Sequence, residues 1–114
     1  MSWWVSLNVK GKSVEVGRFT EGGTYAIGGQ TEADLNITYN YGKFYKSLDQ
    51  DKGLEYLNRK KAKTCIPKLE NAVKALGIDR SNDYWESTSG NAGYALSILL
   101  KWAKQYPNAR FKVI

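Results

Sequence analysis

The spacing of apolar residues changes near Asn40 from a two-residue period to a helical period, and this change limits the fold more than any other feature of the sequence. In residues 3 to 9, apolar side chains alternate with more polar ones, which is typical of a strand with one buried face. Lys10-Gly11-Lys12 then provides a glycine that tolerates positive φ, and Val14 and Val16 resume the alternation. This pattern predicts an N-terminal β-hairpin.

Two further short strands and two short helices are expected in the middle of the chain. Residues 24 to 27 and 35 to 39 are rich in side chains that favour strands, and glycines separate them. Residues 41 to 48 carry apolar side chains at helical spacing, so we predict a helix there with Asn40 as its N-cap. Residues 51 to 57 predict a second short helix.

A longer helix follows, because four apolar residues lie three or four positions apart and share one face. These residues are Ile66, Leu69, Val73 and Leu76. We expect Thr64 to cap the helix, Pro67 to lie in its first turn, where a missing N–H costs little, and Gly77 to end it.

The C-terminal part of the chain predicts one more helix and one more strand. Residues 92 to 106 carry an apolar stripe at helical spacing, and Pro107 prevents the helix from continuing. Residues 110 to 114 alternate between basic and apolar side chains, which favours a final strand with Phe111 and Val113 facing the core.

The order of strands, then helices, then one last strand predicts an α+β fold. We expect a single domain over residues 1–114, with an antiparallel sheet of about four to five strands and three to four helices packed on one face of it. The 114 residues are 42% hydrophobic and include four Trp, eight Tyr and three Phe, which is enough to fill one core.

The composition excludes several classes of chemistry. The chain has no histidine, which excludes Ser-His-Asp triads, Cys-His dyads and imidazole-based zinc sites. Its single cysteine, Cys65, excludes an internal disulfide. The sequence shows neither a secretory leader nor an apolar run of about 18 residues, so we expect a cytoplasmic protein that does not enter a membrane. We expect no metal and no cofactor.

The positive charge is concentrated in the second half of the chain. The sequence has 17 Lys and Arg against 11 Asp and Glu, and the excess lies entirely after residue 50. Its densest run consists of Arg59, Lys60, Lys61, Lys63 and Lys68. Such a run binds phosphate, nucleic acid or an acidic protein surface, or it keeps one face of an amphipathic helix in solvent. The pattern favours neither alternative.

A first polar cluster lies on the strand that ends at Asn40. Asn36, Thr38 and Asn40 alternate with apolar residues, so their side chains share one face. Asn is unfavourable in strands, and a compensating role is therefore expected. The functional interpretation is a row of donors and acceptors that faces a ligand. The structural interpretation is a set of hydrogen bonds that fixes a turn or caps the next helix.

A second polar cluster, residues 83 to 93, immediately precedes the last helix. A glycine-bearing helix start offers free N–H groups to an anion, and Trp85 can stack on a planar group. The structural alternative is an ordinary helix cap, with Gly93 permitting close packing. For a ligand site we select one set of residues from both clusters, with Lys60, Lys61 and Lys63 supplying positive potential. This set is Asn36, Thr38, Tyr41, Trp85, Thr88 and Asn91.

Two enzymatic interpretations rank lower. Cys65 lies close to the start of a predicted helix and near lysines, but it lacks a histidine partner and has the position of a core residue. Asp79, Asp83 and Glu86 are close enough in sequence to hold Mg²⁺ in a carboxylate-dependent hydrolase, or to cap neighbouring helices. We prefer the structural interpretation of both features.

Three segments together resemble a group of small, largely uncharacterised accessory proteins of bacteriophages, prophages and related mobile elements. The segments are TEADLNITYNYGKFY (31 to 45), GLEYLNRKKA (53 to 62) and DYWESTSGNAGYALSILLKWAKQYPNARFKV (83 to 113). The asparagine-rich strand and the TSGNAG helix start are the most specific elements. The resemblance implies a setting in the bacterial cytoplasm during phage infection or lysogeny, where such proteins inhibit host defences.

These observations lead to a non-enzymatic binding protein as the preferred hypothesis. It would be a phage-encoded counter-defence factor, such as an anti-CRISPR protein, that occupies a host immune component or sequesters a nucleotide-like anionic ligand. The alternative is a nucleic-acid-binding protein in which the run from Arg59 to Lys68, together with Arg110 and Lys112, contacts phosphates while exposed Tyr or Trp side chains stack on bases.

Overall fold

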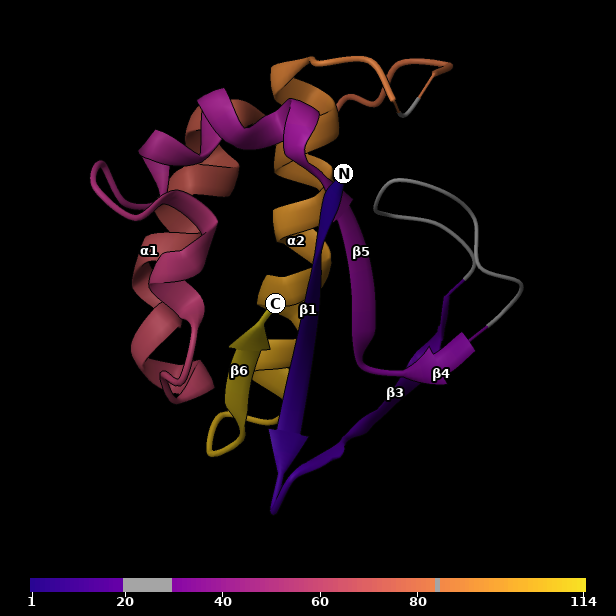
Figure 1. The fold of residues 1–114 in the computed structure, drawn as a ribbon, viewed down its shortest axis with the longest axis vertical. Helices are drawn as coiled ribbons and strands as arrows, with labels where there is room; N and C mark the ends of the chain where they lie inside the picture. Colours follow the sequence, from indigo (N-terminus) through magenta and orange to yellow (C-terminus); the bar gives the residue numbers. More distant parts are fainter. Residues whose placement is uncertain (20–29, 84) are drawn as a thin grey trace.

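The structure is a computed structural model that describes residues 1–19, 30–83 and 85–114 (Figure 1). Its described part contains a four-stranded antiparallel sheet, a separate two-stranded ladder, two 3₁₀ helices and two α-helices. The predicted α+β class is therefore confirmed. The expected strand at residues 24 to 27 lies outside the described residues.

The predicted N-terminal hairpin forms, but its second strand is short, because the residues from Glu15 onward, which were expected to continue it, form a strand in a separate ladder. Strands β1 (Ser2–Val9) and β2 (Lys12–Ser13) pair antiparallel, with Val9 opposite Lys12. The two residues between them, Lys10 and Gly11, have φ of 52° and 79°. Positive φ at both positions gives a turn whose twist matches that of the strands.

β1 is the central strand of the sheet. Strand β5 (Asp34–Thr38) pairs with the first half of β1, and β6 (Arg110–Val113) pairs with the second half along its opposite edge (Figure 1). The last strand thus returns to the sheet as expected, with Phe111 and Val113 buried. Strands β3 (Glu15–Phe19) and β4 (Gln30–Glu32) form the separate ladder.

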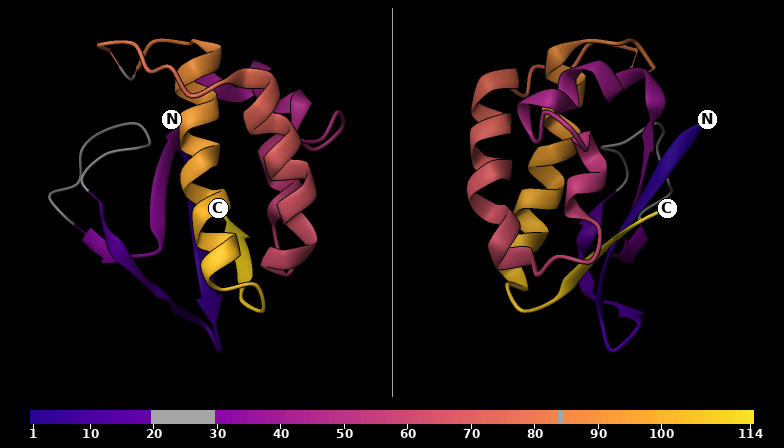
Figure 2. Two further views of the ribbon diagram at one scale, coloured as in Figure 1. Left: turned by 180° about the vertical axis from the view of Figure 1, so that it is seen from behind. Right: turned by 60° about the vertical axis from the view of Figure 1, so that its left-hand side comes forward.

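The α-helices lie on one side of the sheet. Helix α2 (Ser89–Gln105) runs behind β1, β5 and β6, and α1 (Ala62–Leu76) lies beside α2 (Figures 1 and 2). The apolar stripe predicted for the last helix faces the core, where Leu96, Leu99 and Trp102 are buried. Within residues 1–19, 30–83 and 85–114, no helix covers the other face of the sheet, on the side of Trp4 and Ser6.

The helix predicted over residues 41 to 48 is a 3₁₀ helix, η1 (Tyr39–Ser47), and a second one, η2 (Gly53–Leu57), follows it. The prediction that Asn40 caps η1 is wrong. The strand ends at Thr38, whose Oγ1 accepts a hydrogen bond from the Asn40 backbone N–H at 3.2 Å, so Thr38 is the cap.

The prediction that Thr64 caps α1 is also wrong, because the N-cap is Lys61, three residues earlier. The loop before β6 explains this start. The backbone N–H groups of Ala62 and Lys63 donate to the carbonyls of Ala109 and Pro107 at 2.8 and 2.9 Å, which satisfies them without a side-chain cap.

This earlier start places Pro67 in the second turn of α1 rather than in the first. The end of the helix agrees with the prediction. Gly77 has φ of 78°, and its N–H donates to the Val73 carbonyl at 2.8 Å.

Candidate functional site

The side chains of the asparagine-rich strand contact the protein itself. Asn36 and Thr38 are only 4% and 2% exposed. The Asn36 Nδ2 donates to Ser2 Oγ at 2.8 Å, and Thr38 caps η1. Tyr41 is buried in the core, where its ring meets that of Tyr45 edge-on. These three residues therefore stabilise the junction between β5 and η1.

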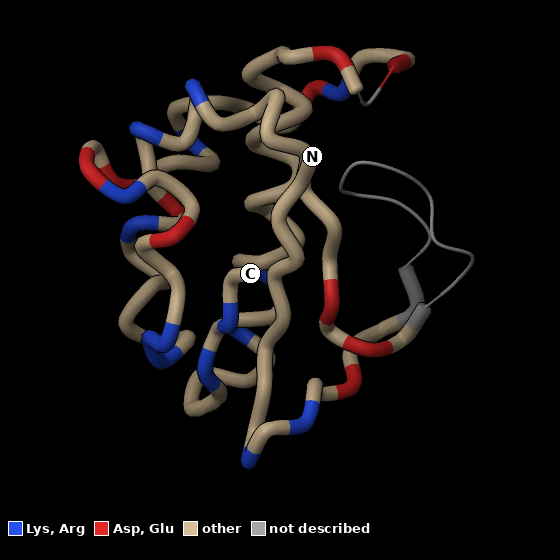
Figure 3. The backbone as a smooth tube through the Cα atoms, viewed as in Figure 1, with Lys and Arg blue, Asp and Glu red and all other residues tan. Residues whose placement is uncertain are grey.

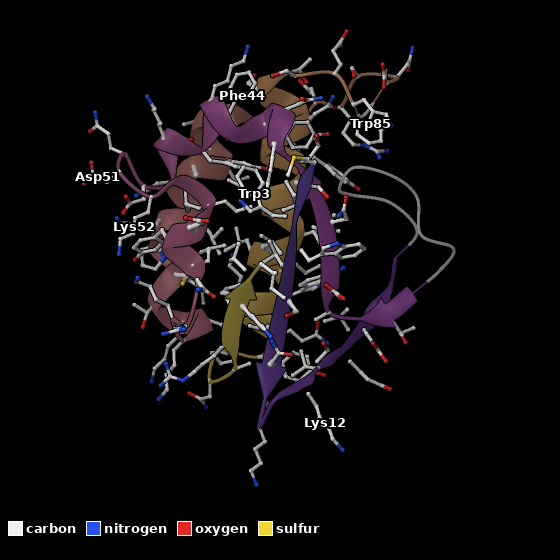
Figure 4. All side chains as sticks on the ribbon, viewed as in Figure 1. Trp3, Lys12, Phe44, Asp51, Lys52 and Trp85 are labelled. Carbon is white, nitrogen blue, oxygen red and sulfur yellow. The ribbon has the colours of Figure 1, made fainter. Side chains whose placement is uncertain are left out.

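The two polar clusters meet at Asn40. Its Nδ2 donates to the Trp85 carbonyl at 3.1 Å, and its own carbonyl accepts from Ser87 Oγ at 2.7 Å. Trp85 is half-exposed and lies at the same end of the molecule as the start of β1 (Figure 4). The residues that join the clusters thus hydrogen-bond to each other.

Asn91 is the centre of the second cluster. It is 3% exposed, and its backbone N–H donates to Oγ1 of Thr88, the cap of α2, at 3.1 Å. Its Oδ1 accepts from the Ser81 N–H, while its Nδ2 lies within 2.9 to 3.1 Å of Ser81 Oγ and the carbonyls of Asp83 and Glu86. Asn91 therefore links Ser81, Asp83 and Glu86 to the start of α2.

The basic run divides into two groups of residues that lie in different parts of the structure and make different contacts. Lys60 and Lys68 place their Nζ atoms 4.3 and 4.2 Å from the centre of the Tyr56 ring, a cation–π geometry. Lys68 also forms a 3.1 Å ion pair with Asp49. The backbone N–H of Lys52 and the Lys68 ammonium lower the pKa of Asp49 to about 2. This group has a structural role.

Arg59 belongs to the second group, which lies beside β6. The Arg59 N–H donates to the Phe111 carbonyl at 2.9 Å, the Phe111 N–H donates to the Lys60 carbonyl at 3.0 Å, and Lys61 forms a β-bridge with Arg110. One guanidinium nitrogen of Arg110 donates to the Arg59 carbonyl at 2.9 Å. Backbone pairing therefore attaches a row of cations to the sheet.

This row borders a concavity of about 680 Å³ on the face of the sheet opposite the helices. The residues that line it come from the β1–β2 hairpin, β5, β6 and residues 58–59 beside β6. They include Trp4, Ser6, Asn8, Arg59, Arg110 and Lys112. We refer to this surface as the open face.

The open face combines an aromatic ring, polar groups and cations. Trp4 is 40% exposed, whereas Trp3, which points to the other side of β1, contacts the rings of Tyr39 and Tyr45. Asn8 Nδ2 donates to Ser6 Oγ at 2.9 Å along the strand. Such a surface can hold a planar ring against Trp4 and an anion against the cations of β6.

Asp34 lies at the side of the open face away from β6. Asp34 lines the concavity, and Glu32 precedes it on β4, whereas lysine and arginine lie along β6 (Figure 3). Burial, and to a lesser extent the charge of Glu32, raises the pKa of Asp34. Asp34 therefore lies across β1 from the cations of β6.

Sequence reasoning missed the β1 side of this face. The outward half of the alternation in residues 3 to 9, namely Trp4, Ser6 and Asn8, was the available signal. Arg110 and Lys112 entered the nucleic-acid alternative, but nothing in the sequence showed that they lie next to Trp4. That proximity comes from the pairing of Asn8 with Arg110 and of Ser6 with Lys112.

The groups considered for enzymatic chemistry have other surroundings. Cys65 is buried, and burial raises the pKa of its thiol to about 11. Asp83 Oδ1 accepts the Trp85 N–H at 2.9 Å. Across the described ranges 1–19, 30–83 and 85–114, no three Cys, Asp or Glu side chains group together as metal ligands, and no helix is long and apolar enough to span a bilayer.

Comparison of the chain with protein-family models, with curated proteins and with solved structures gives no match. The resemblance to phage accessory proteins remains a prediction. So does the ligand-binding role of the six residues selected from the polar clusters.

Proposed function

We propose that this chain is a non-enzymatic binding protein that holds a phosphate-bearing ligand with a planar ring, of the nucleotide class, on its open face. The observation that supports this proposal is the position of Trp4 beside the cations Arg59, Arg110 and Lys112 around one concavity. Aromatic stacking accepts any base, and guanidinium and ammonium groups bind phosphate.

The proposal combines the two binding hypotheses that the sequence suggests. A nucleotide-like ligand and a nucleic acid share the same recognition chemistry, a ring and a phosphate. If the chain acts in a phage-infected bacterium, the same face would sequester an anionic nucleotide signal. The occupation of a host immune component is a prediction that depends on the resemblance alone.

The test is the binding of a fluorescein-labelled 12-nucleotide single strand of mixed sequence, followed by fluorescence anisotropy at several salt concentrations. Three cations at the face predict a salt slope of about −2, that is, about 20-fold weaker binding at 200 mM than at 50 mM salt. ATP is the probe for the mononucleotide form of the ligand, and calorimetry measures its binding.

The double variant Arg110→Gln/Lys112→Gln removes two of the three cations, and we expect it to weaken binding at least tenfold. The matched control is Lys46→Gln/Lys74→Gln, which removes the same net charge from exposed positions on η1 and α1. Equal loss of affinity in the two double variants would reject the proposed function. So would a wild-type protein that binds neither the single strand nor ATP.

A further inference from the structure

The cations of the open face lie at two different distances from Trp4. The backbones of Trp4 and Ile114 exchange hydrogen bonds of 3.1 and 3.0 Å, and Lys112 lies two residues earlier on β6. Strand geometry therefore places the Cα atoms of Trp4 and Lys112 about 8 Å apart. The N–H of Arg59 donates to the Phe111 carbonyl along the other edge of β6, so the Arg59 backbone is about 12 Å from that of Trp4.

A second guanidinium lies beside Arg59. One guanidinium nitrogen of Arg110 donates to the Arg59 carbonyl at 2.9 Å, so the Arg110 side chain reaches across to the segment that carries Arg59. Guanidinium groups present planar sets of donors that match the oxygens of phosphate. The open face thus has one nearer cation, Lys112, and a farther pair of arginines. We refer to Arg59 and Arg110 as the distal pair.

The backbone of Arg59 has a conformation that favours glycine. Asn58 has φ of −59° and ψ of 126°, Arg59 has φ of 70°, and the Lys60 N–H donates to the Leu57 carbonyl at 3.1 Å. These values define a type II turn over residues 57–60, with Arg59 at the position where glycine is preferred. An arginine there costs backbone free energy that a glycine would not. Contact of its side chain with a ligand accounts for this cost.

We infer that the open face binds a nucleoside polyphosphate, with the base on Trp4, the first phosphate at Lys112 and the terminal phosphate at the distal pair. This inference rests on the proposed function and names the ligand and its orientation. In a nucleotide, the ribose separates the base from the first phosphate, and each further phosphate extends the chain by one P–O–P link. A monophosphate stacked on Trp4 therefore reaches Lys112 alone, whereas a triphosphate extends to the distal pair.

The experiment compares AMP, ADP and ATP by calorimetry with the full chain. The buffer contains no Mg²⁺, so that only the cations of the protein neutralise the phosphates. We expect the affinity to rise from AMP to ADP to ATP, with ATP binding at least tenfold more tightly than AMP. Inorganic triphosphate has the same chain of phosphates but no base, and it should bind about tenfold more weakly than ATP because it lacks the stacking on Trp4.

Two variants assign the ends of the ligand to their residues. Arg59→Gly should lower the affinity for ATP about tenfold and leave that for AMP within about twofold, because only the longer chain reaches Arg59. Glycine suits the turn, so the urea midpoint of this variant should be no lower than that of the wild-type protein. Trp4→Ala should weaken AMP and ATP binding by the same factor, about ten.

Two further variants complete the set. Arg59→Gln removes the charge but keeps a side chain at the turn, and it should lose as much ATP affinity as Arg59→Gly. The matched control is Lys46→Gln, which removes one positive charge from an exposed position on η1. We expect it to leave the affinities for AMP and ATP within about twofold of the wild-type values.

Equal affinity of the wild-type protein for AMP and ATP would overturn the inference, and so would equal losses for the two ligands in Arg59→Gly and Arg59→Gln. Either result would leave the proposed function in place, because AMP also carries a ring and a phosphate. Binding of the 12-nucleotide single strand without binding of ATP would likewise overturn the inference alone. Binding of neither would reject the proposed function itself.

Discussion

Gly93 in α2 lies so close to Gly77, at the end of α1, that a β-carbon on Gly93 would be 1.8 Å from the Gly77 carbonyl oxygen. Gly90 has the same relationship to Asp79, whose carbonyl oxygen would be 1.9 Å from a β-carbon. The start of α2 therefore packs backbone against backbone. This close approach explains both glycines of the TSGNAG segment without a ligand.

The variant Gly93→Ala should be strongly destabilised. Alanine favours a helix over glycine by about 1 kcal/mol, but the new methyl group meets a backbone carbonyl that cannot rotate away. We expect a net loss of about 3 kcal/mol or more in the free energy of unfolding, measured in urea. The control is Gly17→Ala in β3, where no atom of the described part of the chain lies within 4 Å of the added carbon. Equal stability of the two variants would contradict this packing.

Asn91→Ala should also destabilise the fold, by a different mechanism. The substitution removes a buried amide that hydrogen-bonds to Ser81, Asp83 and Glu86, and it leaves the groups of these residues without those hydrogen bonds. We expect a loss of about 2–4 kcal/mol in denaturant unfolding. Asn71→Ala, at an exposed position on α1, should change stability by less than about 0.5 kcal/mol. A loss at Asn91 as small as that at Asn71 would show that the loop does not depend on it.

The pKa of Asp49 predicts how stability changes with pH. Its folded-state value is about 2 against an ordinary value of 3.8, so between these values the folded chain binds fewer protons at this group than the unfolded chain does. Asp49 therefore stabilises the fold above about pH 4, and this contribution disappears as the pH falls toward 2.

The comparison is between the wild-type protein and Asp49→Asn, by chemical denaturation from pH 7 to pH 2. The substitution keeps an oxygen for the Asp51 and Lys52 N–H groups but removes the charge that pairs with Lys68. We expect the wild-type protein to be the more stable above pH 4, with a difference that vanishes near pH 2. If the difference in the free energy of unfolding between the two proteins did not change with pH, the stabilisation would come from the shape of the side chain and not from its charge.

Local periodicity predicts much of this fold, because strands and helices with one buried face carry that face in their sequence. The alternation in residues 3 to 9 and the stripe in residues 92 to 106 both correspond to observed elements. The start of α1 does not follow from periodicity, because its first N–H groups are satisfied by Pro107 and Ala109, more than forty residues away. A side-chain cap was expected where a distant loop supplies the acceptors.

The candidate site was also hard to predict from the sequence, because it depends on contacts between residues that are far apart in the chain. The polarity of Asn36 and Asn91 is visible in the sequence, but their partners are not, and those partners turned out to lie within the chain. Trp4 and Lys112 are unremarkable as single residues. They become a candidate site only because strand register places them on adjacent strands of one face.

The division of the basic run gives a last prediction. Lys60 and Lys68 lie against Tyr56, whereas Arg59 and Lys112 line the open face. The variant Lys60→Gln/Lys68→Gln should therefore lose stability, by about 1 kcal/mol in urea, because it removes two cation–π contacts and one ion pair. It should keep the single-strand affinity of the wild-type protein within about threefold, whereas Arg59→Gln/Lys112→Gln should show normal stability and weak binding. Both variants lower the net charge by two, so long-range electrostatics affects them alike. If the first variant lost as much affinity as the second, the run would act as one basic surface and the distinction drawn from Tyr56 would be wrong.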